Sequence, residues 1–143
     1  MISLDDINKF RFRFVIQVRY SDMDMLGHAN NAVYLTYLEL ARIAYFREIN
    51  ESGSKDVALV LAHAEMDFKI PLTPGTKPVV RMRTTRLGKS SVTIENIITD
   101  EADERLFFSA STVMVAVDTK TGRPVPIPDN EKQKVIAYEP TLD

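Results

Sequence analysis

The chain has 143 residues, of which 45% are hydrophobic and 27% charged, and its formal net charge is -2. This is the size and composition of one ordinary globular domain. The small charge gives no argument for nucleic acid or an anionic membrane as the main partner, and the absence of Cys excludes disulfides, thiolate metal sites and a cysteine nucleophile.

The start of the chain, MISLDDINKF, carries two adjacent aspartates and no apolar core segment, so we expect no secretory signal. No stretch approaches the roughly 18 apolar residues that predict a membrane span. We therefore expect a cytoplasmic protein without a membrane partner. It should form a single domain over residues 1–143, with a C-terminal tail from about residue 122, where the sequence GRPVPIPDN begins.

Residues 10–20 alternate between apolar and polar side chains, which predicts a half-buried strand. Residues 22–28 break this alternation and include a glycine. The apolar residues of 31–49 then recur with helical spacing, over an arc wider than a surface helix needs. Asn30 or Asn31 is a suitable N-cap, because an asparagine side chain accepts hydrogen bonds from free backbone N–H groups. We expect a long helix that is covered on more than one side.

Further along the chain, alternating segments predict four more strands, at 57–70, 79–86, 91–99 and 105–118. The connections PLTPGTKP, LGKS and DEADE between them are short turns, and short links make neighbouring strands antiparallel. Residues 129–138 are expected to form a short terminal helix. The order strand, helix, four strands predicts an α+β fold in which an antiparallel five-stranded sheet wraps around one long central helix.

The loop ahead of the long helix, YSDMDMLGHANN, gathers two aspartates, a histidine and two asparagines. These side chains can simply shape the turn and cap the helix. They can also form a reaction site, because the unpaired N–H groups at a helix start attract negative charge. A metal site from Asp22, Asp24 and His28 is a weaker alternative, since the set lacks a recognisable ligand spacing. We expect no metal and no cofactor.

The stretch RYSDMDMLGHANNAVYLTYLELAR resembles the hotdog-fold acyl-CoA thioesterases, in particular the 4-hydroxybenzoyl-CoA thioesterase group. The shared signature is an aromatic residue before D-x-D, a short glycine-containing loop, a polar helix start and Y-x-x-x-x-E/D-x-A-R. It is met here by Tyr20, Asp22, Asp24, Gly27, Asn31, Tyr34, Glu39, Ala41 and Arg42. The segment EMDFKIPLTPG resembles the second strand and following turn of that group. The likeness covers about residues 12–118 and implies a hotdog fold.

The resemblance implies a thioester hydrolase that converts acyl-CoA to a carboxylic acid and free CoA. Asp24 is implied as nucleophile or general base, and the backbone N–H of Asn31 as the donor to the carbonyl oxygen when it becomes an oxyanion. His28 is expected either to shape the loop or to orient Asp24. Glu39 is a further catalytic candidate, because a second hotdog subgroup places its carboxylate on this helix; alternatively, it pairs with Arg42 one turn on.

Contacts to CoA are implied at the hairpin between the third and fourth strands. Lys89 and Ser90 match a Lys-Ser pair of the 4-hydroxybenzoyl enzyme. That enzyme has two arginines just before this pair, where the present chain has Leu87 and Gly88. We expect Arg86 to substitute for them, since the phosphates of CoA favour basic partners.

The resemblance also implies a homodimer or homotetramer with the active site between subunits. Apolar side chains on the second face of the last strand, at Val113, Val115 and Val117, agree with a further partner for the sheet. Tyr34 can line an acyl pocket or belong to the core. Two other functions stay open: a thioesterase for acyl-carrier protein, favoured by a basic patch at the pocket mouth, and a module that only binds acyl-CoA.

Overall fold

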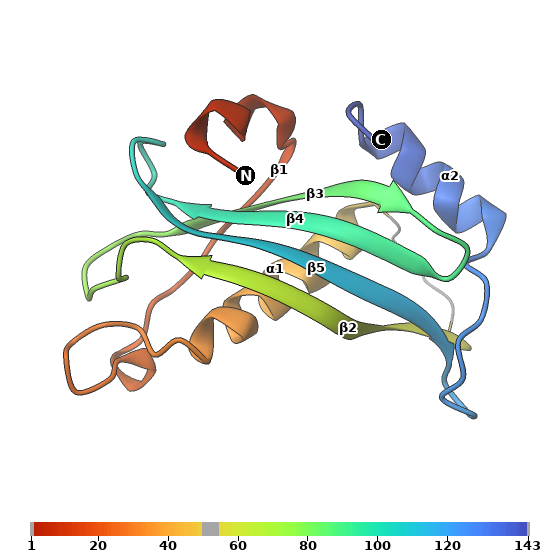
Figure 1. Cartoon of the computed structure of the whole chain (residues 1–143), viewed down its shortest axis with the longest axis horizontal. Helices are drawn as coiled ribbons and strands as arrows, with labels where there is room; N and C mark the ends of the chain where they lie inside the picture. The colour runs from red at the N-terminus through yellow and green to blue at the C-terminus, as the bar shows by residue number, and fades with distance from the viewer. Residues whose placement is uncertain (1, 50–54, 143) are drawn as a thin grey trace.

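The computed structural model describes residues 2–49 and 55–142 and shows a curved sheet packed around a long helix (Figure 1). In chain order the elements are η1 (Leu4–Lys9), β1 (Phe12–Val15), η2 (Tyr20–Asp22), α1 (Val33–Ile49), β2 (Val57–Phe68), β3 (Val79–Leu87), β4 (Ser91–Thr99), β5 (Leu106–Asp118) and α2 (Asp129–Tyr138). The strands form one antiparallel sheet in the order β1-β3-β4-β5-β2. This is the predicted α+β hotdog architecture. No helix within the described ranges is long and apolar enough to cross a bilayer.

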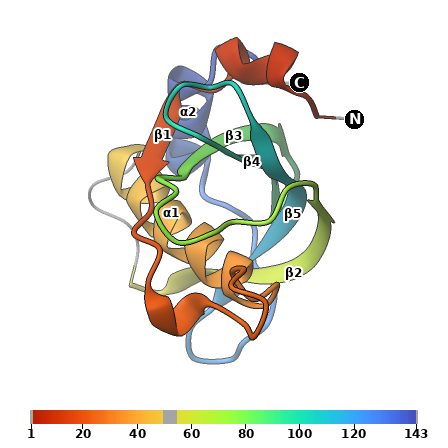
Figure 2. The same ribbon diagram turned by 90° about the vertical axis from the view of Figure 1, so that its left-hand side faces the viewer.

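Helix α1 is the centre of the core, and the sheet curves around it (Figure 2). Its buried residues recur every three or four positions and form one stripe: Tyr34, Tyr37, Leu38, Ala41 and Tyr45. Near the start of the helix, Tyr34 stacks on Phe108 of β5, with ring centroids 4.9 Å apart. Near its end, Tyr45 packs edge-on against Phe12 of β1 at 5.2 Å. Packing at both ends holds this stripe against the sheet. Outside the stripe, Leu40 and Ile43 are 51% and 49% exposed, so the described residues of the single chain do not cover the helix on more than one side as expected.

The first strand is shorter than the predicted segment 10–20. The ladder between β1 and β3 ends at the pair of Val15 and Val79. Ile16 N still donates to the Pro78 carbonyl at 2.9 Å, but proline has no N–H with which to continue the pairing. The alternation predicts burial correctly beyond the end of the strand, with Ile16 only 5% exposed, but not to the end of the predicted segment, where Tyr20 is 89% exposed.

The remaining elements follow the predicted ranges closely. β4 and α2 match them, and the other strands differ by no more than two residues at either end. Helix α1 begins at Val33 rather than Asn31. Asn30, one of the two predicted caps, is confirmed in that role: its Oδ1 accepts from Ala32 N at 3.0 Å and its carbonyl from Val33 N at 2.9 Å.

The segment expected as a tail packs against the domain. Ile127 N donates to the Lys89 carbonyl at 2.9 Å, which leads the chain past the β3–β4 hairpin into α2. At the end of α2, Tyr138 and Glu139 are 9% and 3% exposed. The Tyr45 hydroxyl of α1 donates to the Glu139 carboxylate. The C-terminal helix is thus tied to the central one.

Candidate active site

The polar loop ahead of α1 is a closed turn held by its own backbone. Met23 and Ala29 form an isolated antiparallel bridge, and Asp24 N donates to the His28 carbonyl at 2.7 Å. Gly27 has a φ of 73°, a left-handed conformation in which a side chain is strained. The chain therefore reverses within the loop and returns toward the start of the helix.

The Asp24 carboxylate is exposed and is held through one oxygen. Its Oδ1 accepts hydrogen bonds from the backbone N–H groups of Leu26, at 2.9 Å, and His28, at 3.2 Å. No described residue donates to Oδ2. The Asx-type turn thus orients the carboxylate and leaves its second oxygen open to a substrate, so turn formation and chemistry are compatible in this residue.

Asp22, the first carboxylate of the D-x-D, is only 2% exposed. Its side chain accepts from Arg19 N at 2.9 Å, from the Arg19 guanidinium at 3.0 Å and from the Tyr37 hydroxyl at 2.8 Å. Burial raises the pKa of this carboxyl, but the hydrogen bonds from Arg19 and Tyr37 outweigh it and hold the pKa below its ordinary 3.8. The Asp22 carbonyl also accepts from Asn30 N at 2.8 Å. Asp22 therefore ties the loop to the helix.

The weaker alternative of a metal site has no support in this arrangement of the loop. Asp22 is turned into the core, whereas Asp24 is exposed. Across residues 2–49 and 55–142, no group of three or more His, Asp or Glu side chains is placed to hold a metal ion.

The start of α1 presents an unpaired amide at Asn31. The next two amides have partners, since Ala32 N and Val33 N both donate to Asn30. Asn31 is exposed, and its N–H has no acceptor among the residues that the structure describes. A free N–H at the positive end of a helix can donate to a carbonyl oxygen that gains negative charge.

The other two catalytic candidates have different surroundings. His28 contacts Asp24 through its backbone, and its ring makes no hydrogen bond to a described residue. Glu39 is exposed and forms no ion pair within the described part of the chain. Its expected partner Arg42 is half-buried: burial lowers the pKa of that guanidinium, and the charge of Glu39 opposes the effect. The two residues thus interact through space rather than by contact.

The predicted CoA-binding residues lie far from this loop. The β3–β4 hairpin is at the opposite end of α1 (Figure 1), where Arg86 and Lys89 are exposed and Ser90 is half-buried. The helix between the two sites has 17 residues and is therefore about 25 Å long. Within one chain, the structure does not bring the hairpin to Asp24.

Tyr34 lies in the core of the single chain, where it is 2% exposed. Burial raises the pKa of its hydroxyl, and a hydrogen bond from Leu72 N opposes that shift. Its ring packs edge-on against Phe68 at 5.0 Å. Phe68 ends β2 and is 42% exposed, so the start of α1 lies beside an exposed aromatic side chain.

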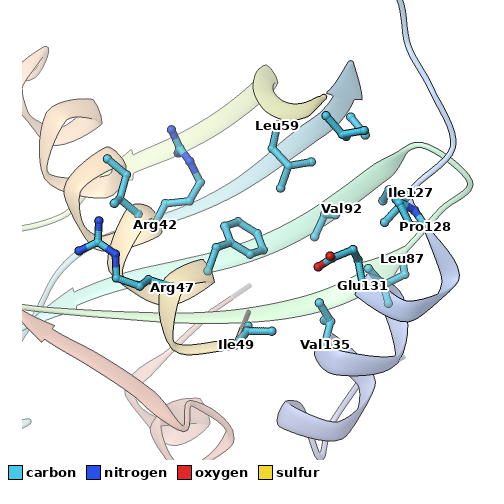
Figure 3. Close-up of a pocket in the computed structure, with 14 residues that line it drawn as sticks. Arg42, Arg47, Ile49, Leu59, Leu87, Val92, Ile127, Pro128, Glu131 and Val135 are labelled. Carbon is cyan, nitrogen blue, oxygen red and sulfur yellow. The ribbon is translucent and has the colours of Figure 1, made fainter. Parts of the chain in front are cut away.

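A cavity of about 440 Å³ lies at the other end of α1, between that helix, the sheet and α2 (Figure 3). Most of its wall is apolar, with contributions from Phe46, Ile49, Leu59, Leu87, Ile127 and Val135. Arg42, Arg47 and Glu131 also line it, and the Glu131 carboxylate faces the cavity. Its volume is typical of a ligand pocket, about 300–1,000 Å³. No sequence motif marks this wall, because it is assembled from separate segments of the chain.

The chain is similar to known proteins over most of its length. The family model of the thioesterase-like superfamily matches residues 18–135, which include the polar loop, α1 and strands β2 to β5. The uncharacterized protein YsmA of Bacillus subtilis strain 168 is 30% identical over 128 residues, 89% of this chain and 86% of that protein. The chloroplastic acyl-acyl carrier protein thioesterase ATL3 of Arabidopsis thaliana is 28% identical over 127 residues, 86% of this chain and 66% of that protein. A solved thioesterase of Thermus thermophilus, complexed with coenzyme A and Zn, is 35% identical with a TM-score of 0.79, over 92% of this chain and 96% of that one.

Proposed function

Because this chain belongs to the thioesterase-like superfamily and is a thioester hydrolase, we propose that it hydrolyses acyl-CoA to a carboxylic acid and free CoA. Asp24 acts as nucleophile or general base, and the Asn31 amide donates to the oxyanion. One observation carries the proposal. The same loop holds a carboxylate through a single oxygen and ends at an unpaired N–H at the start of the central helix.

Either catalytic route uses the free oxygen of Asp24. It can attack the thioester carbon and form a mixed anhydride, which water then hydrolyses, or it can take a proton from the water that attacks. In both routes the carbonyl oxygen becomes negative before the C–S bond breaks, and the Asn31 N–H donates to it. The sulfur leaves with a proton as free CoA. The amides on Oδ1 hold the carboxylate without occupying the oxygen that reacts.

A second copy of the chain completes this proposed site. β2 is an edge strand of 12 residues, paired on one side with β5. Along it, Val60, Leu61 and Phe68 are 44%, 40% and 42% exposed. An uncovered apolar edge is prone to aggregation, and pairing with the β2 of another copy would cover it.

Antiparallel pairing of two β2 strands about a two-fold axis puts the Val57 end of one beside the Phe68 end of the other. The Phe68 end lies beside the start of α1, where Phe68 contacts Tyr34. The Val57 end lines the cavity. In such a dimer the Asp24 loop of each protomer faces the cavity and hairpin of its partner, which removes the separation present in the single chain.

We propose acyl-CoA rather than acyl-carrier protein as the substrate. The Thermus thermophilus thioesterase was solved with coenzyme A bound, which supports a CoA ester for this chain. Arg86 and Lys89 are exposed on the hairpin and suit phosphate groups. Acyl-carrier protein is the second candidate, supported by the likeness to ATL3. The cytoplasmic location stays a prediction from the sequence.

The test is a thiol-release assay on a panel of acyl-CoAs and acyl-carrier proteins. Asp24→Asn keeps the size of the side chain and removes its basicity, so we expect kcat to fall by about 10²–10⁴-fold. Asp5→Asn, at an exposed aspartate of η1, is the matched control and should leave kcat unchanged. Turnover unaffected by Asp24→Asn would shift the assignment to Glu39. Turnover only on carrier-linked substrates would select the second candidate.

The oxyanion donor is tested by removing one N–H. Asn31→Pro deletes the backbone N–H and should lower kcat by about 10²–10³-fold, the usual loss for one such donor. Asn31→Ala removes the side chain but keeps the N–H, so its kcat should stay near that of the wild type. Circular dichroism checks that the proline variant folds. Equal losses in both variants would contradict the role of the amide.

A further inference from the structure

We propose that α2 sets the length of the acyl chain that the enzyme accepts, with Val135 as the specificity-determining residue at the far end of the cavity. This inference rests on the proposed function. It gives the cavity a ligand, a medium-length aliphatic acyl group, and a direction of entry from the β2 edge of the sheet.

The floor of the cavity crosses four neighbouring strands. Leu59 of β2 is paired with Ala116 of β5, and Val92 of β4 is paired with Leu87 of β3. All four side chains line the cavity, and β5 and β4 are adjacent in the sheet. The apolar floor therefore runs from the edge strand, where the partner's Asp24 loop would lie, inward to β3.

The length of this floor gives the length of the ligand. Three spacings between neighbouring strands span about 14 Å. An extended chain advances roughly 1.2 Å per bond, as the backbone does over its three bonds per residue, so the floor accommodates an acyl chain of about a dozen carbons. The aliphatic wall matches such a chain, because burying methylene groups against apolar side chains is favourable.

Helix α2 closes the far end of this path. Val135 is 7% exposed and lines the cavity opposite Ile49 (Figure 3). One turn earlier on the same helix, Glu131 directs its carboxylate into the cavity. An acyl chain longer than the floor would have to displace Val135 or lie against that carboxylate, and both are unfavourable.

The helix is anchored firmly enough to act as a fixed wall. The Glu139 carboxylate, directly after α2, accepts from the Tyr45 hydroxyl and from Thr84 N, the latter at 3.1 Å. The Tyr138 hydroxyl donates to Glu48 of α1. These contacts join the end of α2 to the central helix and to β3, so the position of the cavity wall is fixed by the core.

The experiment measures kcat/KM for saturated acyl-CoAs of increasing length. The wild type should prefer about a dozen carbons. Val135→Ala should move the optimum to longer chains and Val135→Phe to shorter ones. For each substrate methylene that the cavity can newly hold or no longer hold, kcat/KM should change by about 10-fold or more. Ile136→Ala is the matched control: its side chain is 45% exposed on the same helix, so the length profile should stay as in the wild type.

Two additional measurements separate this inference from the proposed function. Binding of non-hydrolysable alkyl-CoA thioethers of the same lengths, followed by calorimetry, reports the length preference without any chemistry. Glu131→Leu removes the carboxylate and should extend the preference to longer chains even if a Val135 variant folds poorly. Unchanged binding profiles in the folded variants would overturn the role of α2. A wild type that binds thioethers with the expected preference but releases no thiol would refute the proposed function alone.

Discussion

Asp22 and Asp24 have opposite surroundings, and the difference separates a structural carboxylate from the one proposed to react. Asp22 is buried and receives three hydrogen bonds, from Arg19 and Tyr37. Asp24 is exposed and keeps one oxygen without a donor among the described residues. A fully satisfied, buried carboxylate stabilises its charged form and fixes the loop, whereas a half-satisfied one is available to a substrate.

The buried position of Asp22 predicts how stability depends on pH. Asp22→Asn should destabilise the protein at neutral pH by about 1.5–3 kcal/mol, because it removes hydrogen bonds to a charged group. The pKa of Asp22 in the folded protein lies below its ordinary 3.8, so its contribution is complete above that value and is lost as pH falls through the folded pKa. Urea unfolding should therefore show a difference between wild type and variant that shrinks in acid. A difference independent of pH would contradict this account.

At the scale of elements, the periodicity of the sequence predicted which residues pack in the core but not where each element ends. The stripe on α1 and the alternating strands are repeated along the chain, so they are visible in the sequence. β1 ends early because its partner strand meets Pro78, a contact between distant segments that no local pattern reports. The η1 helix did have a local signal: Ser3 and Asp6 form a capping box, with Asp6 Oδ2 accepting from Ser3 N at 3.0 Å.

The candidate site likewise has a part that the sequence predicted and a part that it did not. The polar loop is continuous in the chain, so Asp24 and Asn31 were predicted from the motif that they share with thioesterases, and their catalytic roles stay predictions. The cavity is built from two helices and four strands, and Val135 of α2 lines it from a segment that was expected to be a tail. Without the fold, nothing relates α2 to Leu59 of β2.

The attachment of α2 predicts a pH dependence of stability with the opposite sign to the one predicted for Asp22. Burial raises the pKa of Glu139 above its ordinary 4.5, and the hydrogen bonds from Tyr45 and Thr84 offset the effect only in part. Its Oε2 is buried without a hydrogen-bond partner among the described residues. Because the folded protein holds this proton more tightly than the unfolded chain, stability from this group is complete below pH 4.5 and falls as pH rises through the folded pKa.

Glu139→Gln removes the titration and keeps the size of the side chain. The free energy of unfolding of the wild type, measured relative to this variant, should therefore decrease as pH rises above the ordinary value of 4.5. Urea unfolding over a pH series measures it. Glu104→Gln, at an exposed glutamate, serves as the control and should follow the wild type. Parallel curves for wild type and Glu139→Gln would show that the buried carboxyl does not govern the attachment of α2.

For the whole molecule, the separation of the two candidate regions is the main constraint. The Asp24 loop lies at one end of α1, and the cavity and hairpin lie at the other (Figure 1). A thioester bond whose acyl group fills the cavity is therefore out of reach of Asp24 in the same chain. The proposed antiparallel pairing of β2 strands would remove this obstacle by placing the loop of one copy beside the cavity of the other.

Mixing two variants that are inactive toward an acyl-CoA of about a dozen carbons tests this shared site directly. Asp24→Asn disables the loop but keeps the cavity, and Val135→Trp keeps the loop but leaves the cavity too short for this acyl chain. In a mixed dimer, one of the two sites combines the intact loop of one copy with the intact cavity of the other. Random pairing of equal amounts should then restore about a quarter of the wild-type rate of thiol release.

The control is a mixture of Asp24→Asn with Asn31→Pro. Both defects lie in the same loop, so each site of a mixed dimer keeps one of them and no activity should return. Native mass spectrometry verifies that mixed dimers form in both cases. If the first mixture forms mixed dimers and stays inactive, the loop and the cavity do not act across two chains. Since they are also too far apart within one chain, the acyl group would then have to bind outside this cavity, closer to the start of α1.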